Sequence, residues 1–147
     1  MMIKKEIMID SDIKNVWDAF CKIESWNSYC NEIIEAKWIS KEKWKLNSRF
    51  TQTIKLFPLI GIFKSNPKFL KIAPFKEAAW KGNRKLICGV HTFKFKKIGK
   101  KTKVSNIEYF KGHLAFFILP LIKRRFEKYF ENFNQGLKTE AEKNGKI

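Results

Sequence analysis

Two side chains in this sequence, His91 and Glu108, are of the types that transfer protons or hold a polar group of a ligand. An imidazole beside a carboxyl group can orient a ligand hydroxyl or carbonyl, or act on it as an acid and a base. The same pair can be purely structural, because each group is costly to bury alone and a partner offsets part of that cost. The residue types leave these three interpretations open, and no catalytic residue is assigned.

A predicted hairpin brings the two side chains together. Residues 86–98 and 102–110 read as its strands, with a turn at Gly99-Lys100-Lys101 between them. If the strands pair across this turn, His91 lies opposite Glu108. Both side chains then point to the apolar face, away from the lysines, since alternate residues of a strand share a face. We therefore expect the pair to point into the protein.

Aromatic residues are predicted to form the walls around this pair. Aromatics make up 15% of the chain, with 14 Phe and 5 Trp. They are bulky and rigid enough to fill a core or to line a pocket. We predict that inward-facing positions of the strands and the last helix line a ligand pocket. The predicted lining residues are Phe50, Trp80, His91, Phe93, Phe95, Glu108, Phe126, Phe130 and Phe133.

The first third of the chain predicts one strand and two short helices. Apolar residues alternate over residues 3–9, and Ser11 or Asp12 then supplies a helix N-cap. Apolar residues at helical spacing follow over residues 13–20, and residues 26–29 form a second short helix or a turn.

Strand patterns dominate the middle of the chain. They cover residues 33–40, 49–56, 68–72 and 77–82. Between the second and third of these, residues 58–67 are predicted to be a loop because Pro, Gly and Asn punctuate them. This loop also contains Leu59, Ile60, Ile62 and Phe63. It therefore folds either over a ligand as a lid or onto the core of its own domain.

The last third predicts a long helix from Pro120 to Lys143, with the proline in its first turn. Its broad apolar face comprises Leu121, Phe126, Phe130, Phe133, Leu137 and Ala141. Burial of its three phenylalanines contributes roughly 5 to 9 kcal/mol, so the helix must dock on the sheet. Gly136 costs the helix about 1 kcal/mol relative to Ala, which suggests a close approach to the sheet or to a ligand.

The net charge of +17 raises the question of an anionic partner. Only 4 of the 31 basic residues are Arg, and the lysines are spread along the chain. This pattern argues against nucleic acid, which is read mainly by Arg, and indicates a solvated basic surface. Residues 118–129 mix apolar and basic side chains, so they form either a core-facing helix with a solvated basic face or a surface for an anionic membrane.

Other sequence features bear on the cellular location of the protein and on whether it binds a cofactor. The three cysteines, Cys21, Cys30 and Cys88, have no CxxC spacing, which argues against a disulfide framework or a zinc site and predicts a cytoplasmic protein. The charged N-terminal segment does not read as a signal peptide, and residues 114–122 are too short an apolar run to span a membrane. Phosphate-binding glycine motifs are missing from the sequence, so we expect no nucleotide cofactor. The HExxH motif is missing too, and His91 and His113 are the only histidines, so we expect no metal.

Several motifs together resemble the START-like helix-grip superfamily, and specifically its polyketide cyclase/dehydrase-like (SRPBCC) group. In chain order they are Val16-Trp17-Asp18, Trp26-Asn27, Trp80-Lys81-Gly82, Gly89-Val90-His91-Thr92-Phe93, Glu108-Tyr109-Phe110-Lys111-Gly112, Phe133-Asn134-Gln135-Gly136-Leu137-Lys138 and Glu142. The resemblance spans nearly the whole chain, and departs from the family pattern at Ser28, where members often have Pro. It identifies residues 1–147 as a single START-like domain.

The resemblance implies an α+β fold, in agreement with the predominance of hairpins. A curved antiparallel sheet of about seven strands would wrap around the C-terminal helix, with two short helices after the first strand and an apolar cavity between sheet and helix. Members of the family bind lipids, sterols, polyketides or other hydrophobic molecules, and a minority catalyse cyclisation or dehydration. We therefore expect a small hydrophobic ligand. The alternatives are a cyclase or dehydratase acting in the same cavity, and an adaptor for a protein or an anionic membrane.

Overall fold

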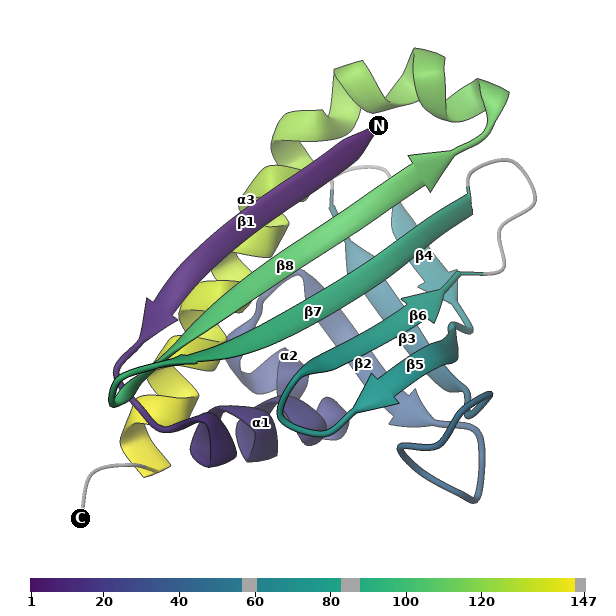
Figure 1. Cartoon of the computed structure of the whole chain (residues 1–147). Helices are drawn as coiled ribbons and strands as arrows, with labels where there is room; N and C mark the ends of the chain where they lie inside the picture. The colour runs from purple at the N-terminus through teal and green to yellow at the C-terminus, as the bar shows by residue number, and fades with distance from the viewer. Residues whose placement is uncertain (57–60, 83–87, 145–147) are drawn as a thin grey trace.

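Eight strands and one long helix make up most of the computed structural model, which describes residues 1–56, 61–82 and 88–144 (Figure 1). The strands are β1 (Met2–Ile9), β2 (Ile33–Trp38), β3 (Phe50–Lys55), β4 (Ile62–Ser65), β5 (Lys68–Ala73), β6 (Glu77–Lys81), β7 (Cys88–Ile98) and β8 (Lys101–Lys111). The helices are α1 (Ile13–Cys21), a 3₁₀ turn (Ile23–Ser25), α2 (Trp26–Tyr29) and α3 (His113–Asn144).

The strands form two antiparallel sheets that meet at one corner. One sheet has the order β1-β8-β7-β6-β5 and the other the order β2-β3-β4. They are joined where Arg49 pairs with Lys68 and the Phe50 N–H donates to the Pro67 carbonyl at 3.2 Å. Figure 1 shows the resulting curved surface around α3. The predicted α+β architecture, with a curved antiparallel sheet around the C-terminal helix, is confirmed.

The region predicted to be a loop contains strand β4, so that prediction is wrong for residues 62–65. β4 pairs with β3, and Asn66 and Pro67 separate it from β5. β4 is therefore additional to the seven expected strands, and it lies in a different sheet from β5. Phe63 packs against the core and also lines the cavity described below, Ile62 is exposed, and Leu59 and Ile60 lie outside the described residues.

The hairpin of β7 and β8 has the predicted register. His91 pairs with Glu108, and Lys97 pairs with Thr102. The turn is one residue shorter than predicted, because Ile98 already pairs with Lys101 and leaves only Gly99 and Lys100 between the strands. Gly99 has a φ of +60°, which two-residue hairpin turns require and glycine adopts without steric cost.

Short helices α1 and α2 close the end of the curved sheet that is lowest in Figure 1. Asp12 is the N-cap, since its side chain accepts a hydrogen bond of 2.8 Å from the Asn15 N–H. Trp17, Phe20 and Trp26 point from these helices into the core. The Trp26 indole N–H donates to the Phe20 carbonyl at 2.8 Å, so the one polar atom of this buried ring is satisfied.

Helix α3 starts seven residues earlier than predicted, with Pro120 inside it rather than in its first turn. Gly112 ends β8 with a φ of +119°, and its carbonyl accepts from the Ala115 N–H to begin the helix. Pro120 cannot donate to the preceding turn, a known cause of helix bending, and α3 is visibly bent in Figure 1. Leu121 is exposed and was wrongly placed on the buried face. None of the described helices is both long and apolar enough to cross a membrane.

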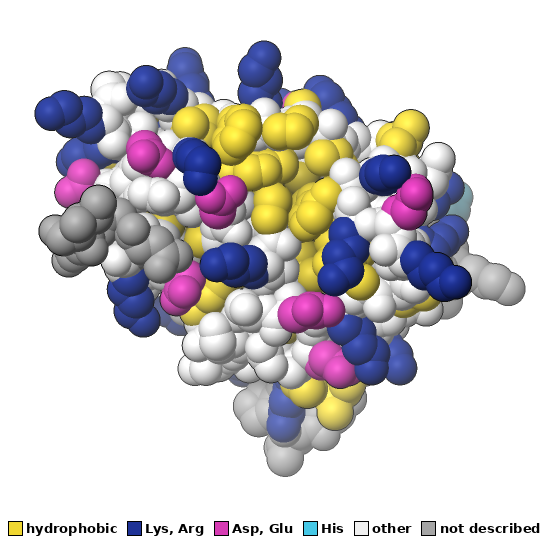
Figure 2. All heavy atoms as spheres, turned by 90° about the horizontal axis from the view of Figure 1, so that it is seen from below, with side chains coloured by type: hydrophobic (Ala, Val, Ile, Leu, Met, Phe, Trp, Pro, Cys, Tyr) yellow, Lys and Arg dark blue, Asp and Glu magenta, His cyan; other side chains and the backbone are white. Residues whose placement is uncertain are grey.

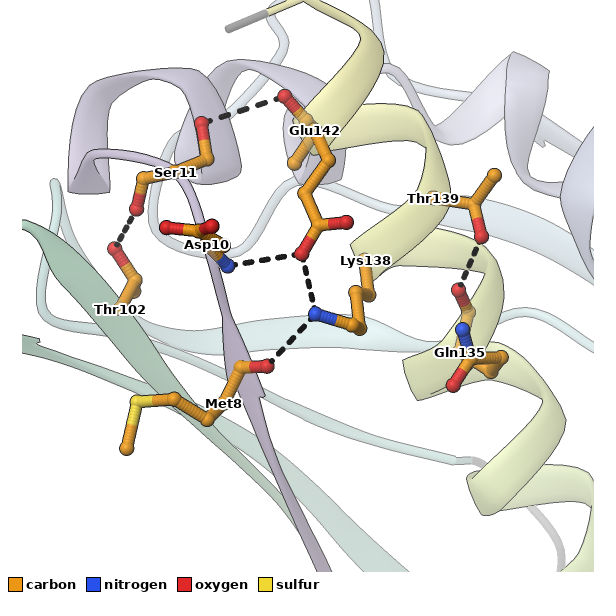
Figure 3. A network of polar contacts seen from close by, with 9 residues as sticks. Met8, Asp10, Ser11, Thr102, Gln135, Lys138, Thr139 and Glu142 are labelled. Atoms are coloured by element: carbon orange, nitrogen blue, oxygen red, sulfur yellow. Dashed lines mark hydrogen bonds and ion pairs between the residues drawn. The ribbon is translucent and has the colours of Figure 1, made fainter.

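Polar contacts fasten the C-terminal half of α3 to the end of β1 (Figure 3). They run from Asp10 N to Glu142 Oε1 (2.9 Å), from Ser11 Oγ to the Ala141 carbonyl (3.3 Å) and from Lys138 Nζ to the Met8 carbonyl (3.2 Å). Ser11 is itself held by β8, because Thr102 Oγ1 donates to its carbonyl at 2.9 Å. Lys138 also pairs with Glu142 one turn along the helix. These contacts hold one end of α3, whereas its first turns extend past the other end of the sheet (Figure 1).

Gly136 marks a close approach, but to helix α2 rather than to the sheet or a ligand. A Cβ atom built at Gly136 would collide with the backbone carbonyl of Tyr29 and would lie 2.6 Å from its ring atom Cδ2. A backbone atom cannot move aside as a flexible side chain does. The glycine therefore allows α3 to pack directly against α2.

We predict that Gly136→Ala lowers the free energy of unfolding by about 1 to 3 kcal/mol, because the overpacking outweighs the better helix propensity of Ala. Urea denaturation monitored by circular dichroism would measure the change. Gln135→Ala is the matched control, since Gln135 is the exposed neighbour on the same helix and its loss should change stability little. Equal stability of Gly136→Ala and wild type would contradict the close approach.

Candidate functional site

A cavity of about 140 Å³ lies between the inner face of the sheet and the first half of α3. Its volume is close to that of an engineered apolar cavity of about 150 Å³ that binds benzene. Space for roughly one ring is therefore present without any rearrangement. The lining residues are Gln52, Ile54, Phe63, Ser65, Pro67, Trp80, Gly82, Gly89, His91, Glu108, Phe110, Leu119, Ile122, Phe126 and Tyr129.

The predicted pocket residues divide into two groups. Those that line the cavity are Trp80, His91, Glu108 and Phe126. Those that are buried in the packed core and do not line it are Phe50, Phe93, Phe95, Phe130 and Phe133. Aromatic rings from α1 and α2 cause this division: Phe20 packs on Phe93 and Phe95, and Trp26 packs on Phe50 and Phe133. These contacts fill the end of the sheet's concave side that lies next to α1 and α2. The cavity remains at the opposite end.

His91 is held in place by aromatic rings on both sides. Its ring centroid lies 5.0 Å from that of Phe93 and 4.9 Å from that of Phe130, each with an interplanar angle of 22°. Trp80, directly opposite on β6, approaches to 4.9 Å. Phe93 and Phe130, which do not line the cavity, therefore orient His91, which does.

A chain of buried hydrogen bonds determines which nitrogen of His91 carries the proton. Asn134 on α3 donates its amide N–H to the Lys5 carbonyl at 3.4 Å, and that carbonyl can only accept. The Asn134 side-chain oxygen therefore accepts from Asn106 Nδ2 at 3.2 Å. The remaining oxygen, Asn106 Oδ1, lies 2.6 Å from His91 Nε2, so this nitrogen must be the donor. Neutral His91 thus keeps its lone pair on Nδ1.

Glu108 faces that lone pair from the neighbouring strand. Its Oε2 lies 3.8 Å from His91 Nδ1, which is too long for a direct hydrogen bond, and its side chain is 16% exposed. The carboxyl group occupies the space above Gly89, where a Cβ atom would collide with Glu108 Oε1. Gly89 therefore permits the observed position of the carboxyl group at the wall of the cavity.

Both groups are uncharged at neutral pH. Burial raises the pKa of Glu108 from 4.5 to about 8. Burial also lowers the pKa of His91 from 6.5 to about 4, and the hydrogen bond to Asn106 only partly opposes this effect. A protonated carboxyl group can donate, and the His91 Nδ1 lone pair can accept. A ligand hydroxyl placed between them would satisfy both.

A second polar pair, Gln52 and Tyr129, lines the cavity and was not predicted. Gln52 Nε2 donates to the Tyr129 hydroxyl at 2.9 Å, and both side chains are buried. The Tyr129 hydroxyl keeps its own proton for another acceptor. The sequence did contain a signal for Gln52, a polar residue between Phe50 and Ile54 on the inward face of a strand. Tyr129 lies beside the predicted apolar face of α3 and gave no comparable signal.

Metal ligation finds no support among the residues that the structure describes. Within residues 1–56, 61–82 and 88–144, no group of three His, Cys, Asp or Glu side chains is arranged to hold a metal ion. The candidate site is therefore described by its apolar lining and its two polar pairs.

Solved structures with the same arrangement are found across the whole length of the chain. The protein TTHA0849 from Thermus thermophilus superposes with a TM-score of 0.82 at 11% identity, covering 99% of this chain and 100% of that one. The Zhui aromatase/cyclase from Streptomyces sp. R1128 has a TM-score of 0.81 at 8% identity, with coverages of 100% and 96%. A START superfamily protein from Mycobacterium smegmatis has a TM-score of 0.78 at 11% identity, with coverages of 97% and 98%.

The chain has the START-like helix-grip fold. This confirms the architecture that the sequence motifs implied. No protein-family model and no curated protein matches the sequence. At identities this low the helix-grip likeness concerns the path of the backbone, and the function must be argued from the cavity itself.

The shifted pKa values predict how stability depends on pH. Between pH 4.5 and 6.5 the two groups act in opposite directions: the unfolded state binds more protons at His91, and the folded state binds more at Glu108. From pH 6.5 to 8 only Glu108 contributes, and stability should fall by about 2 kcal/mol. Urea unfolding at pH values across this window would measure the fall.

Glu108→Gln is the variant that isolates this effect. Its amide does not titrate, so the difference in unfolding free energy between wild type and variant should change by the same amount between pH 6.5 and 8. Parallel pH profiles for the two proteins would show that Glu108 has an ordinary pKa in the folded state.

Proposed function

We propose that this protein binds a small, uncharged hydrophobic molecule that carries a hydroxyl or carbonyl group, in the cavity between the sheet and α3. The observation that carries this proposal is the polar end of the cavity, where neutral His91 and protonated Glu108 offer one acceptor and one donor. Apolar walls stabilise the body of such a ligand, and one or two hydrogen bonds orient it.

The size of the cavity narrows the ligand class. The sequence resemblance implies lipid-like, sterol-like or polyketide-like molecules, and two neighbours in structure are aromatase/cyclases. A volume of about 140 Å³ suits one ring, such as part of an aromatic polyketide. A sterol or a lipid chain would fit only if α3 moved or if most of the ligand remained outside. These considerations favour a small aromatic ligand, or one end of a larger one.

We also propose a cytoplasmic location. All three cysteines, Cys21, Cys30 and Cys88, are free thiols in the structure. Free thiols are typical of proteins in reducing compartments.

Native mass spectrometry of the protein purified from its host tests the proposal most directly. A discrete adduct, identified after solvent extraction as an uncharged hydrophobic compound with a hydroxyl or carbonyl group, is the expected result. A bare protein mass, together with no thermal stabilisation by any member of a panel of such compounds, would overturn the proposal.

The polar end can be tested with a pair of small probes, phenol and toluene, which have similar shapes but differ in the hydroxyl group. His91→Phe should lower the affinity for phenol relative to toluene by roughly fivefold to tenfold, because the lone pair that accepts from the hydroxyl is removed. Isothermal titration calorimetry of both probes against wild type and variant measures the change in this ratio.

Thr92→Val is the matched control for that experiment. Thr92 is the next residue on β7, is also buried, and points to the opposite face of the sheet. Its replacement should leave the ratio of the two affinities unchanged. If His91→Phe also leaves the ratio unchanged, His91 does not contact the ligand.

A second candidate function is catalysis of a cyclisation or dehydration in the same cavity. The observation that favours it is the pairing of a carboxyl group whose pKa is about 8 with a neutral imidazole 3.8 Å away. A carboxyl group with this pKa can give up its proton near neutral pH, whereas the imidazole, whose pKa is lowered to about 4, accepts a proton only weakly through its Nδ1 lone pair. In this reading Glu108 donates a proton to a ligand oxygen, and His91 Nδ1 accepts one from a neighbouring atom.

For this second function we predict that Glu108→Gln abolishes turnover of a polyketide-like carbonyl substrate while its binding survives. A lost general acid typically costs about 100-fold to 10,000-fold in rate. Turnover should also fall as the pH rises through about 8, where Glu108 loses its proton. Full activity of the variant would exclude Glu108 as the acid, and the binding function would stand without the catalytic one.

A further inference from the structure

The first turns of α3 have two faces with different surroundings. On the inner face, Leu119 and Ile122 line the cavity. On the outer face, the side chains of Phe116, Phe117 and Leu121 are 75%, 71% and 82% exposed. Large apolar side chains exposed together on one short stretch usually mark a surface that meets a partner or a membrane. We refer to Phe116, Phe117 and Leu121 as the apolar tip.

Basic residues follow the apolar tip along the same side of the helix. Phe117, Leu121, Arg124 and Lys128 are spaced so that they form one stripe, and all four are exposed. At 1.5 Å per residue, Arg124 lies about 10 Å further along the helix than Phe117. The nearby acidic groups already have basic partners, Glu127 with Lys123 at 3.9 Å and Glu131 with Lys5 at 2.8 Å. The stripe therefore changes from apolar to basic along its length.

The opposite end of the molecule has a different character. Figure 2 shows hydrophobic side chains gathered there, with both basic and acidic side chains around them. At that end the ring of Trp17 packs on those of Trp44 and Phe75. Because basic and acidic side chains are mixed there, that end does not favour a partner of either charge. The stripe on α3, whose charged part is basic, favours an anionic partner.

We propose that the apolar tip docks on an anionic lipid bilayer, with Phe116, Phe117 and Leu121 entering the boundary between headgroups and acyl chains and with Arg124 and Lys128 against the anionic headgroups. Interfacial segments typically bury their apolar side chains about 5 to 10 Å deep and keep their basic side chains at the level of the headgroups. Each basic side chain near an anionic surface adds to the attraction, and the net charge of +17 brings the protein there.

Docking in this way has a consequence for the cavity. The helix segment that would face the bilayer is the segment whose other side lines the cavity through Leu119, Ile122 and Phe126. A hydrophobic ligand would then enter from, or leave to, the membrane with little exposure to water. This consequence rests on the proposed binding function, whereas the docking itself does not.

Vesicle co-sedimentation tests the docking. The wild-type protein should bind vesicles of phosphatidylcholine mixed with phosphatidylserine, bind vesicles of phosphatidylcholine alone only weakly, and lose affinity as salt is added. The triple variant Phe116→Ser/Phe117→Ser/Leu121→Ser should bind the anionic vesicles at least about tenfold more weakly. Circular dichroism would verify that it is folded. No binding by the wild type at low salt, or equal binding by the triple variant, would overturn the proposal.

Two matched controls separate local docking from general attraction. Ile39→Ser/Leu46→Ser removes apolar side chains that are also exposed but lie between β2 and β3, and it should bind as the wild type does. Arg124→Glu/Lys128→Glu should bind at least about tenfold more weakly. Lys97→Glu/Lys100→Glu, at the far end of the β7–β8 hairpin, makes the same change in net charge and should lose less than about twofold. Equal losses in the two charge variants would mean diffuse attraction to a basic protein and would overturn the proposal.

The competing occupant of the apolar tip is a second copy of this chain. Sedimentation velocity at the concentrations of the vesicle experiment should show a monomer for both wild type and triple variant. A wild-type dimer that the triple variant separates, with no vesicle binding, would overturn the docking. The phenol and toluene titrations contain no vesicles, so failure of the docking and failure of the ligand function are seen separately.

Discussion

The chemistry of the cavity depends on one chain of hydrogen bonds that crosses the core from β1 to β7. It runs from the Lys5 carbonyl through Asn134 of α3 and Asn106 of β8 to His91. Because a backbone carbonyl can only accept, it determines the orientation of both amide groups and the position of the imidazole proton. Any other arrangement would leave a buried donor or acceptor unpaired, at a cost of about 1 to 3 kcal/mol. The same chain ties α3 to the sheet, so the helix position and the polar end of the cavity are coupled.

Aromatic packing explains why the concave side of the sheet is full at one end and hollow at the other. Rings from α1 and α2 reach Phe50, Phe93, Phe95 and Phe133 and fill the end where those helices lie. At the other end the lining includes Gly82 and Ser65, which occupy little volume, and Gly89, which leaves room for the Glu108 carboxyl group. The cavity thus lies away from α1 and α2, where the first turns of α3 pass over the sheet.

The two proposals concern opposite faces of the same helix segment. Its inner face closes a cavity whose polar groups are neutral, and its outer face exposes large apolar side chains followed by basic ones. Pro120 lies within this segment, and α3 is bent as it leaves the sheet. A hydrophobic ligand and a lipid surface would therefore meet the protein at one end, while the polar contacts around Glu142 hold the helix at the other.

The sequence by itself determined the features that depend on residues close together in the chain. Strand alternation, a cap at Ser11 or Asp12 and the glycine turn predicted the order of elements apart from β4, and the pairing of His91 with Glu108, because period and turn chemistry are local properties. Only the tertiary structure decided which inward rings fill the core, that Gln52 meets Tyr129, and that Gly136 lies against Tyr29. These outcomes depend on the volumes and hydrogen-bond partners supplied by segments far apart in the chain, which no local pattern contains.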